Sequence, residues 1–334
     1  MKYQNRLQDN RIQCQVCPRG CTIPAGGSGF CNVRKNIDGE IQLVTYGYNT
    51  GLSVDPIEKK PLYHFYPGSK VLSFGTLGCN MGCLFCQNWH ISKSTENPQN
   101  LYPAQPAEIA QAAVDHDCKS VAYTYNDPTI FIEYVRDTAI ECRKLGVKNV
   151  AVTAGYINPE ARKDFFEYID AANIDLKGFT DEFYKKYCQA SLKPVLETIK
   201  YVKNETDAWL ELTTLLIEGE NDSNDDLKRQ CEWILSNLGE HVPLHFSAFF
   251  PAWQVQDKPP TSKETLIRAY ETAKEAGLKY VYTGNIANLA SSATYCENCH
   301  NAIILRTGYH LSELNLTEDG HCQFCGHQCH GRFQ

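Results

Sequence analysis

Most of the sixteen cysteines fall into three tight groups whose spacing suits metal binding. The chain begins MKYQNRLQDNRIQ, which is too polar for a secretory signal. In a chain without such a signal, grouped cysteines are expected to bind metals rather than to form disulfides. The isolated cysteines are expected to be buried thiols, and these are Cys118, Cys142, Cys188 and Cys231.

The central group lies in TLGCNMGCLFCQNWH (76–90), where Cys79, Cys83 and Cys86 are spaced C-x3-C-x2-C. Three thiolates can hold three irons of a [4Fe–4S] cluster and leave the fourth iron open. The amino and carboxylate groups of S-adenosylmethionine (SAM) would fill that position, and an electron would then cleave the sulfonium to give a hydrogen-abstracting deoxyadenosyl radical. Spacing alone also allows a zinc site, or a four-cysteine cluster completed by a distant ligand.

The C-terminal group consists of two C-x2-C knuckles, Cys296 with Cys299 and Cys322 with Cys325. Two such knuckles complete a tetrahedral four-sulfur site, which predicts a zinc-ribbon-like module with structural zinc. Rubredoxin-like iron is the competing interpretation. Other side chains nearby could replace one ligand, namely Cys329, His321, His327 and His330.

The N-terminal group, Cys14, Cys17, Cys21 and Cys31, lies among turn-forming prolines and glycines with little periodicity. A metal is therefore expected to organise this region. The spacing fits either a second zinc or an auxiliary iron–sulfur cluster, and it does not decide between them. A cluster would relay electrons, whereas zinc would only fold the segment.

Short apolar strands alternate with amphipathic helices between these flanking groups, which predicts a parallel α/β sheet. No Gly-x-Gly-x-x-Gly or Walker loop follows the first strand, so a full or partial barrel is favoured, with its chemistry at the carboxyl ends of the strands. The expected helices include 107–116, 130–146 and 262–277. The expected strands are 70–77, 119–125, 148–154, 172–179, 209–217, 243–250 and 279–284.

Three regions follow from this pattern: a Cys-rich metal-binding segment at 1–70, a barrel at 71–285 and a ribbon-like module at 286–334. The net charge of −7 argues against a nucleic-acid binder. No apolar run is long enough for a membrane span. A cytoplasmic protein is expected.

The chain resembles the radical SAM superfamily over nearly its whole length, in the central GCNMGCLFCQN, the phrases YNDPTIF, DLKGF and YVYTGN, and both flanking cysteine groups. Within that superfamily it is similar to proteins related to pyruvate formate-lyase activating enzyme, specifically to the radical SAM component of the AmmeMemoRadiSam system. The resemblance implies a partial (β/α)6-type barrel, a [4Fe–4S] cluster and SAM.

The same resemblance implies further cofactor contacts. Phe85 would place its backbone near the adenine of SAM. Asn126 and Asp127 would face the SAM amino end, and Asp175 and Lys177 would lie near the ribose and carboxylate.

Simpler interpretations of these residues stay open. Asp127 precedes Pro128 and could only open a helix. Asp175 and Lys177 could only form a salt bridge at the barrel rim. His245, on the sixth strand, suits a core position as well as a site.

The resemblance further implies an oxidoreductase of the glycyl-radical-activating type, whose substrate is a backbone glycine of a protein and whose electron donor is a low-potential flavodoxin or ferredoxin. Radical modification of a small molecule is the alternative within the superfamily. A non-catalytic scaffold with zinc at all three sites is a third hypothesis, which the C-x3-C-x2-C spacing disfavours.

Overall fold

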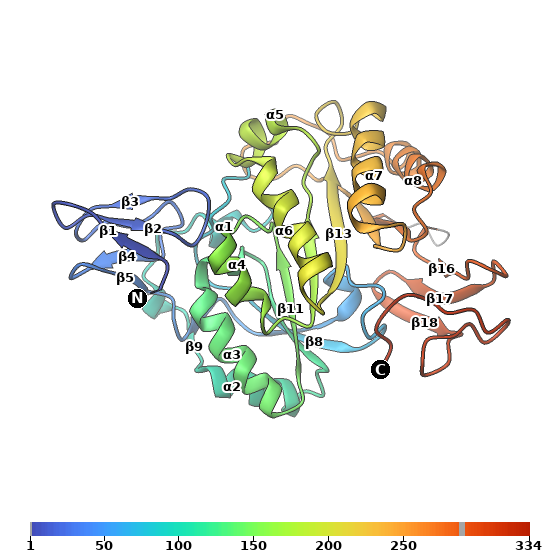
Figure 1. The fold of residues 1–334 in the computed structure, drawn as a ribbon, viewed down its shortest axis with the longest axis horizontal. Helices are drawn as coiled ribbons and strands as arrows, with labels where there is room; N and C mark the ends of the chain where they lie inside the picture. The colour runs from blue at the N-terminus through green and yellow to red at the C-terminus, as the bar shows by residue number, and fades with distance from the viewer. Residues whose placement is uncertain (1, 287–290) are drawn as a thin grey trace.

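A sheet of eight strands forms the centre of the protein in the computed structural model, which describes residues 2–286 and 291–334 (Figure 1). Seven neighbouring strands are parallel, and β7 pairs antiparallel with β8 at one edge. The strand order is β15-β14-β13-β12-β11-β10-β8-β7, an open row that fits a partial barrel. All seven predicted strands are confirmed, as β8 (Lys70–Phe74), β10 (Ser120–Tyr123), β11 (Lys148–Thr153), β12 (Ala171–Asp175), β13 (Trp209–Leu216), β14 (Leu244–Ala248) and β15 (Val281–Gly284).

Helices follow the strands and cover the outer face of the sheet. Side-chain caps define where two of them begin: Ser223 accepts from the Asp226 N–H, and Ser262 accepts from the Thr265 N–H. Gly277 ends the last helix with a φ of 112°, as a C-terminal glycine should. The helices are α2 (Pro106–Asp115), η3 (Pro128–Phe131), α3 (Ile132–Lys144), α4 (Pro159–Phe166), α6 (Leu192–Glu205), α7 (Asn224–Leu238) and α8 (Lys263–Ala276).

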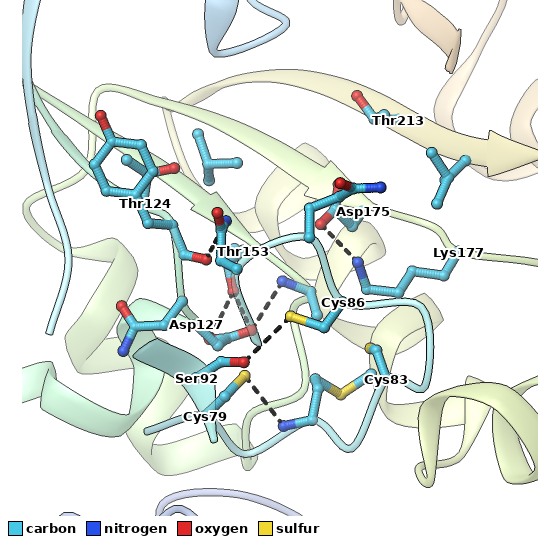
Figure 2. A pocket seen from close by; sticks show the side chains of 18 of the residues that line it. Cys79, Cys83, Cys86, Ser92, Thr124, Asp127, Thr153, Asp175, Lys177 and Thr213 are labelled. Carbon is cyan, nitrogen blue, oxygen red and sulfur yellow. Dashed lines mark hydrogen bonds and ion pairs between the residues drawn. The ribbon is translucent and has the colours of Figure 1, made fainter. Parts of the chain in front are cut away.

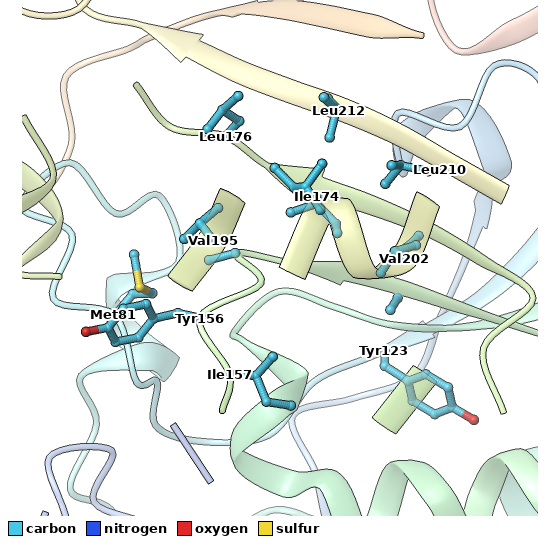
Figure 3. Close-up of a cluster of buried hydrophobic side chains, with 14 of the residues drawn as sticks. Met81, Tyr123, Tyr156, Ile157, Ile174, Leu176, Val195, Val202, Leu210 and Leu212 are labelled. Atoms are coloured by element: carbon cyan, nitrogen blue, oxygen red, sulfur yellow. The ribbon is translucent and has the colours of Figure 1, made fainter. Parts of the chain in front are cut away.

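The main core lies between the sheet and these helices. β-branched and leucine side chains of β12 and β13 point outward and pack against α6 (Figure 3). Burying such side chains contributes about 1.5–3 kcal/mol each. The residues drawn in this contact include Ile174, Leu210, Leu212, Val195 and Val202.

The N-terminal segment forms small sheets beside the barrel (Figure 1). It is anchored through Arg34, whose guanidinium donates to the Ile130 carbonyl at 2.9 Å and pairs with Glu133 of α3. At the end of this segment, β7 (Ser53–Pro56) is part of the barrel sheet. The remaining strands are β1 (Gln4–Arg6), β2 (Ile12–Cys14), β3 (Thr22–Ile23), β4 (Arg34–Ile37), β5 (Glu40–Leu43) and β6 (Tyr48–Asn49), which pairs with β9 (Tyr102–Pro103).

The C-terminal module is a three-stranded sheet of β16 (Thr294–Tyr295), β17 (Ala302–Thr307) and β18 (His310–Leu314). Residues 287–290, within the predicted module 286–334, lie outside the described residues. The module packs where the barrel strands begin, and the guanidinium of Arg306 in β17 donates to the Tyr63 carbonyl. Segment 57–66, which includes η1 (Ile57–Lys59), fills this end with Ile57, Leu62 and Phe65.

His245 belongs to this closed end of the barrel. Its Nε2 lies 2.7 Å from a carboxylate oxygen of Glu211, and both side chains are buried. The same carboxylate accepts the backbone N–H groups of Tyr63 and His64. Of the two interpretations of His245, the structure supports the core histidine.

None of the helices in the described part of the chain has the length and apolar character that crossing a bilayer requires.

Candidate active site

A cavity of about 350 Å³ opens at the carboxyl ends of the barrel strands, and Cys79, Cys83 and Cys86 line it (Figure 2). This volume lies within the range of ligand pockets in proteins. The three cysteines come from the loop between β8 and α1 (Trp89–Ser92). The predicted central site is therefore brought together at the end of the barrel where chemistry is expected.

Two glycines allow this loop to pack closely. A Cβ on Gly78, whose φ is +80°, would lie 2.0 Å from the Cys31 carbonyl oxygen, and a Cβ on Gly82 would lie 2.3 Å from the Gln189 side chain. Only glycine fits such positions. The side chain of Asn126 stabilises the loop with two hydrogen bonds: it donates to the Gly78 carbonyl at 2.8 Å and accepts from the Thr76 N–H at 3.1 Å.

The loop also runs beside a π-helical turn, η4 (Tyr184–Cys188), which follows the short helix α5 (Asp181–Phe183). The N–H groups of Gly82 and Leu84 donate to the carbonyls of Cys188 and Tyr187, both at 2.9 Å. Single π-turns of this kind often occur at functional sites. A hydrogen bond from the Cys188 thiol lowers the pKa of Cys83, although burial opposes the shift. The hydrogen bond between Cys188 and Cys83 was not predicted from the sequence, because it depends on the π-turn.

Cys188 is buried, as are the other three isolated cysteines, so the prediction of buried thiols is confirmed.

Asp127 faces the cavity from the end of β10 and is fully engaged with the protein. Its carboxylate accepts from the N–H groups of Thr129 and Ala154, at 3.0 and 2.9 Å, and from the hydroxyls of Thr129 and Thr153. Burial raises the pKa of Asp127 despite these bonds. The bond to the Thr129 N–H caps η3. Asp127 therefore both caps a helix and lines the cavity, as the two interpretations made from the sequence suggested.

Asp175 ends β12 and Lys177 follows it on the opposite wall, with Lys177 Nζ 2.9 Å from Asp175 Oδ2 (Figure 2). Burial lowers the pKa of Lys177, but the carboxylate of Asp175 and the thiols of Cys83 and Cys188 outweigh burial and raise it well above its ordinary value. The predicted salt bridge is therefore present, and it places a permanent cation beside the cysteine loop. Asn126 and Phe85 also line the cavity.

One further wall of the cavity was not predicted from the sequence, and it is formed by Lys59 and Lys60 after β7. Lys60 is buried and lies 2.8 Å from Asp55, which also binds Lys59 and accepts from the Tyr125 hydroxyl. Burial raises the pKa of Asp55, but the hydrogen bonds from Lys59 and Lys60 outweigh burial and lower it. The only available signal was two consecutive lysines before Pro61.

Comparison with known proteins identifies the family. The model of the radical SAM superfamily matches residues 74–231. An uncharacterised protein of Methanocaldococcus jannaschii is 43% identical over 325 residues, which cover 97% of this chain and 96% of that protein. The chain belongs to the radical SAM superfamily. Membership implies a [4Fe–4S] cluster and SAM, and it makes this protein a radical SAM enzyme.

Solved structures with the same barrel support the fold. SuiB from Streptococcus suis bound to SAM has a TM-score of 0.52 and 14% identity, covering 69% of this chain and 53% of SuiB. SuiB has also been solved with its precursor peptide SuiA. A radical SAM methyltransferase from Sphaerobacter thermophilus has a TM-score of 0.51 and 14% identity, covering 66% of this chain and 68% of that one. This chain spans about half the length of SuiB.

Outside the radical SAM barrel, the C-terminal cysteines form a compact tetrad. The sulfurs of Cys296 and Cys325 are 3.6 Å apart, those of Cys299 and Cys322 are 3.7 Å apart, and all four lie within 4.8 Å of one another. A tetrahedral zinc with Zn–S bonds of about 2.3 Å sets its sulfurs about 3.8 Å apart. The four predicted ligands therefore suit one metal ion. Cys329 lies outside the tetrad, beside the hydroxyl of Tyr280.

Burial raises the pKa of Cys14, and the charges of Cys31 and Cys21 raise it further, so the N-terminal thiols lie within electrostatic range of one another. The distances between their sulfurs are, as a group, larger than those in the C-terminal tetrad. In residues 2–286 and 291–334, no three of these thiols come within 4.8 Å of one another.

Proposed function

We propose that the protein reductively cleaves SAM at a [4Fe–4S] cluster held by Cys79, Cys83 and Cys86. The observation that carries this proposal is the meeting of three thiols from one loop with a carboxylate and a lysine at the open end of the barrel. When bound, the cluster supplies the electron that releases a 5′-deoxyadenosyl radical for hydrogen abstraction. The donor set fits, because the cavity lining offers three thiols, and a cluster of four irons held by them would keep its fourth iron open for SAM.

The residues of the chain would bind and orient SAM. Lys177 offers a cation to the SAM carboxylate, and Asp127 offers negative charge toward the SAM amino group. Phe85 presents backbone for the adenine. Apolar side chains of Met81 and Leu215 in the lining limit the access of water.

The proposed hydrogen donor is a backbone glycine of a protein. This proposal is supported by an exposed aromatic surface beside the cysteine loop. The rings of Trp89 and Trp253 stack there with their centroids 6.5 Å apart, and Phe250 is 44% exposed. Such exposed aromatic groups are typical of protein-binding surfaces. The cavity volume also suits a small molecule, which remains the second candidate. A cytoplasmic location and a flavodoxin or ferredoxin as donor belong to the same proposal.

The test is anaerobic reconstitution with iron and sulfide, followed by addition of dithionite and SAM and quantification of 5′-deoxyadenosine and methionine. Equal amounts of the two products are expected. A fully iron-loaded protein that releases neither would overturn the proposal and favour a metal-binding scaffold.

Replacing Lys177 by methionine is expected to raise the KM for SAM about tenfold, which corresponds to about 1.4 kcal/mol. The reason is that the carboxylate of SAM would lose its only proposed cation. The measurement is 5′-deoxyadenosine formation against SAM concentration at matched iron content. Lys186→Met, at an exposed lysine paired with Glu220, is the control and should leave the KM unchanged. An unchanged KM in Lys177→Met would contradict the assignment.

We also propose that the C-terminal tetrad binds zinc, on the evidence of its sulfur spacing. Cys322→Ser is expected to lose this zinc while the iron content stays the same, as measured by elemental analysis. Cys329→Ser is the matched control, since it removes a buried neighbouring thiol outside the tetrad. Zinc lost from the control but kept in Cys322→Ser would show that the ligand set is wrong.

A further inference from the structure

The N-terminal and C-terminal cysteine groups differ in the distances between their sulfurs, which the sequence does not reveal. In the C-terminal tetrad the sulfurs are close enough to share one ion, with contacts of 3.6 and 3.7 Å. The N-terminal thiols lie near enough to act electrostatically on one another, yet in the described part of the chain no three of them lie within 4.8 Å of one another. One tetrahedral zinc needs every sulfur pair about 3.8 Å apart. The N-terminal group is therefore too wide for a single zinc ion.

A [4Fe–4S] cluster binds each cysteine at a different corner of a cube, so its sulfurs stand further apart than those around one metal. The proposed catalytic thiols are also widely spaced. Among the described residues, the sulfurs of Cys79, Cys83 and Cys86 do not all lie within 4.8 Å of one another. We propose that Cys14, Cys17, Cys21 and Cys31 hold a second [4Fe–4S] cluster with all four irons ligated.

Backbone N–H groups already point at these sulfurs. The Phe30 N–H donates to Cys21 Sγ at 3.4 Å. Cys14, Cys17 and Cys31 accept from the N–H groups of nearby residues in the same way. Hydrogen bonds to the sulfurs stabilise the negative charge of an all-cysteine cluster and tune its potential.

A buried cation adds to this effect. Arg34 is 2% exposed, and its charge lies close enough to Cys14 and Cys31 to act on both thiols.

The second cluster would lie against the catalytic loop. The Cys31 carbonyl packs on Gly78, next to Cys79, so closely that a Cβ would not fit. The side chain of Arg19 donates to the Asn80 carbonyl, in the same loop. Asn158, after β11, donates to the Cys17 carbonyl at 3.1 Å. The N-terminal thiols are thus fixed to the carboxyl end of the barrel.

This position suits an electron relay, a role that rests on the proposed function. A low-potential one-electron carrier would reduce the second cluster, which would then pass the same electron to the catalytic cluster. Phe30, whose N–H donates to Cys21 Sγ, is 41% exposed, and the Arg19 guanidinium lies 3.5 Å from its ring centroid. A cationic and aromatic surface of this kind suits an acidic electron-carrier protein.

The decisive experiment removes the catalytic thiols and counts metals. The variant Cys79→Ala/Cys83→Ala/Cys86→Ala, reconstituted anaerobically, should retain about four irons and one zinc per chain and give a reduced-cluster signal in low-temperature electron paramagnetic resonance. The complementary variant, with alanine at all four N-terminal cysteines, should also retain about four irons. A catalytic-site variant with no iron and about two zincs would overturn the proposal.

The relay is tested with two reductants. Deoxyadenosine formation driven by reduced flavodoxin, divided by formation driven by dithionite, should fall by roughly an order of magnitude in the N-terminal variant. An equal loss with both reductants would overturn the relay. Failure of the wild type to cleave SAM with dithionite would overturn the proposed function instead, while the metal counts would still test the second cluster.

Discussion

Replacing Cys83 by alanine is expected to abolish 5′-deoxyadenosine formation. The catalytic cluster would keep two thiolates, and the loop between β8 and α1 has no other thiol aimed into the cavity. Iron content should fall by about four atoms per chain if the second cluster stays intact. The measurements are product quantification after dithionite and SAM, and iron analysis on the same sample.

The chain offers a close control for this variant. Cys188 is buried beside Cys83 and shares a hydrogen bond with it, but it does not line the cavity. Cys188→Ala should keep both iron and SAM cleavage. If instead Cys188→Ala lost the iron and Cys83→Ala kept it, the assignment of ligands in this loop would be wrong.

Replacing Arg306 by methionine is expected to lower the free energy of unfolding by about 3–5 kcal/mol, because it would leave a buried carboxylate without its cation. Arg306 is 2% exposed, lies 3.8 Å from Glu58 and packs 4.1 Å from the ring centroid of Tyr63. It also donates to the carbonyls of Tyr63 and Ser292. The measurement is urea unfolding of the zinc-loaded protein.

Two comparisons make this prediction specific. Adding Glu58→Gln to Arg306→Met should recover part of the loss, since the unpaired charge is removed with its partner. Arg229→Met removes a largely exposed arginine paired with Asp226 and should change stability by less than about 1 kcal/mol. Equal losses in the single and double variants would show that packing, not charge, explains the role of Arg306.

The loss should also depend on pH. Burial raises the pKa of Glu58, although the charge of Arg306 opposes the shift. Without Arg306 the folded-state pKa rises further above the unfolded value, so the folded state binds more protons. The stability of Arg306→Met relative to the wild type should therefore improve as the pH falls toward the acid range.

The sequence predicted the strands and helices of the barrel well, because buried parallel strands appear as short apolar runs and their helices carry capping serines and closing glycines. It missed β7, whose four residues, SVDP, have no strong strand pattern. Because β7 was missed, so were Lys60 on the cavity wall and its ion-pair partner Asp55, which lies in that strand.

The cysteine spacing predicted where metals could bind but not which metals. The distances between sulfurs depend on how separate turns are packed, and the contact between Cys83 and Cys188 depends on a π-turn that residue types do not specify. The position of His245 beside Glu211 likewise became clear only when segment 57–66 was seen to close the barrel.

The zinc-ribbon-like module and the cysteine loop lie at opposite ends of the barrel, one where the strands begin and the other where they end (Figure 1). This separation has a consequence for how the protein matures and survives oxygen. Because Arg306 and segment 57–66 close this end of the barrel without the catalytic thiols, we expect this end to fold before the proposed catalytic cluster is delivered. Loss of the proposed catalytic cluster to oxygen should then leave this end of the barrel folded, so that a new cluster can be built on the existing chain.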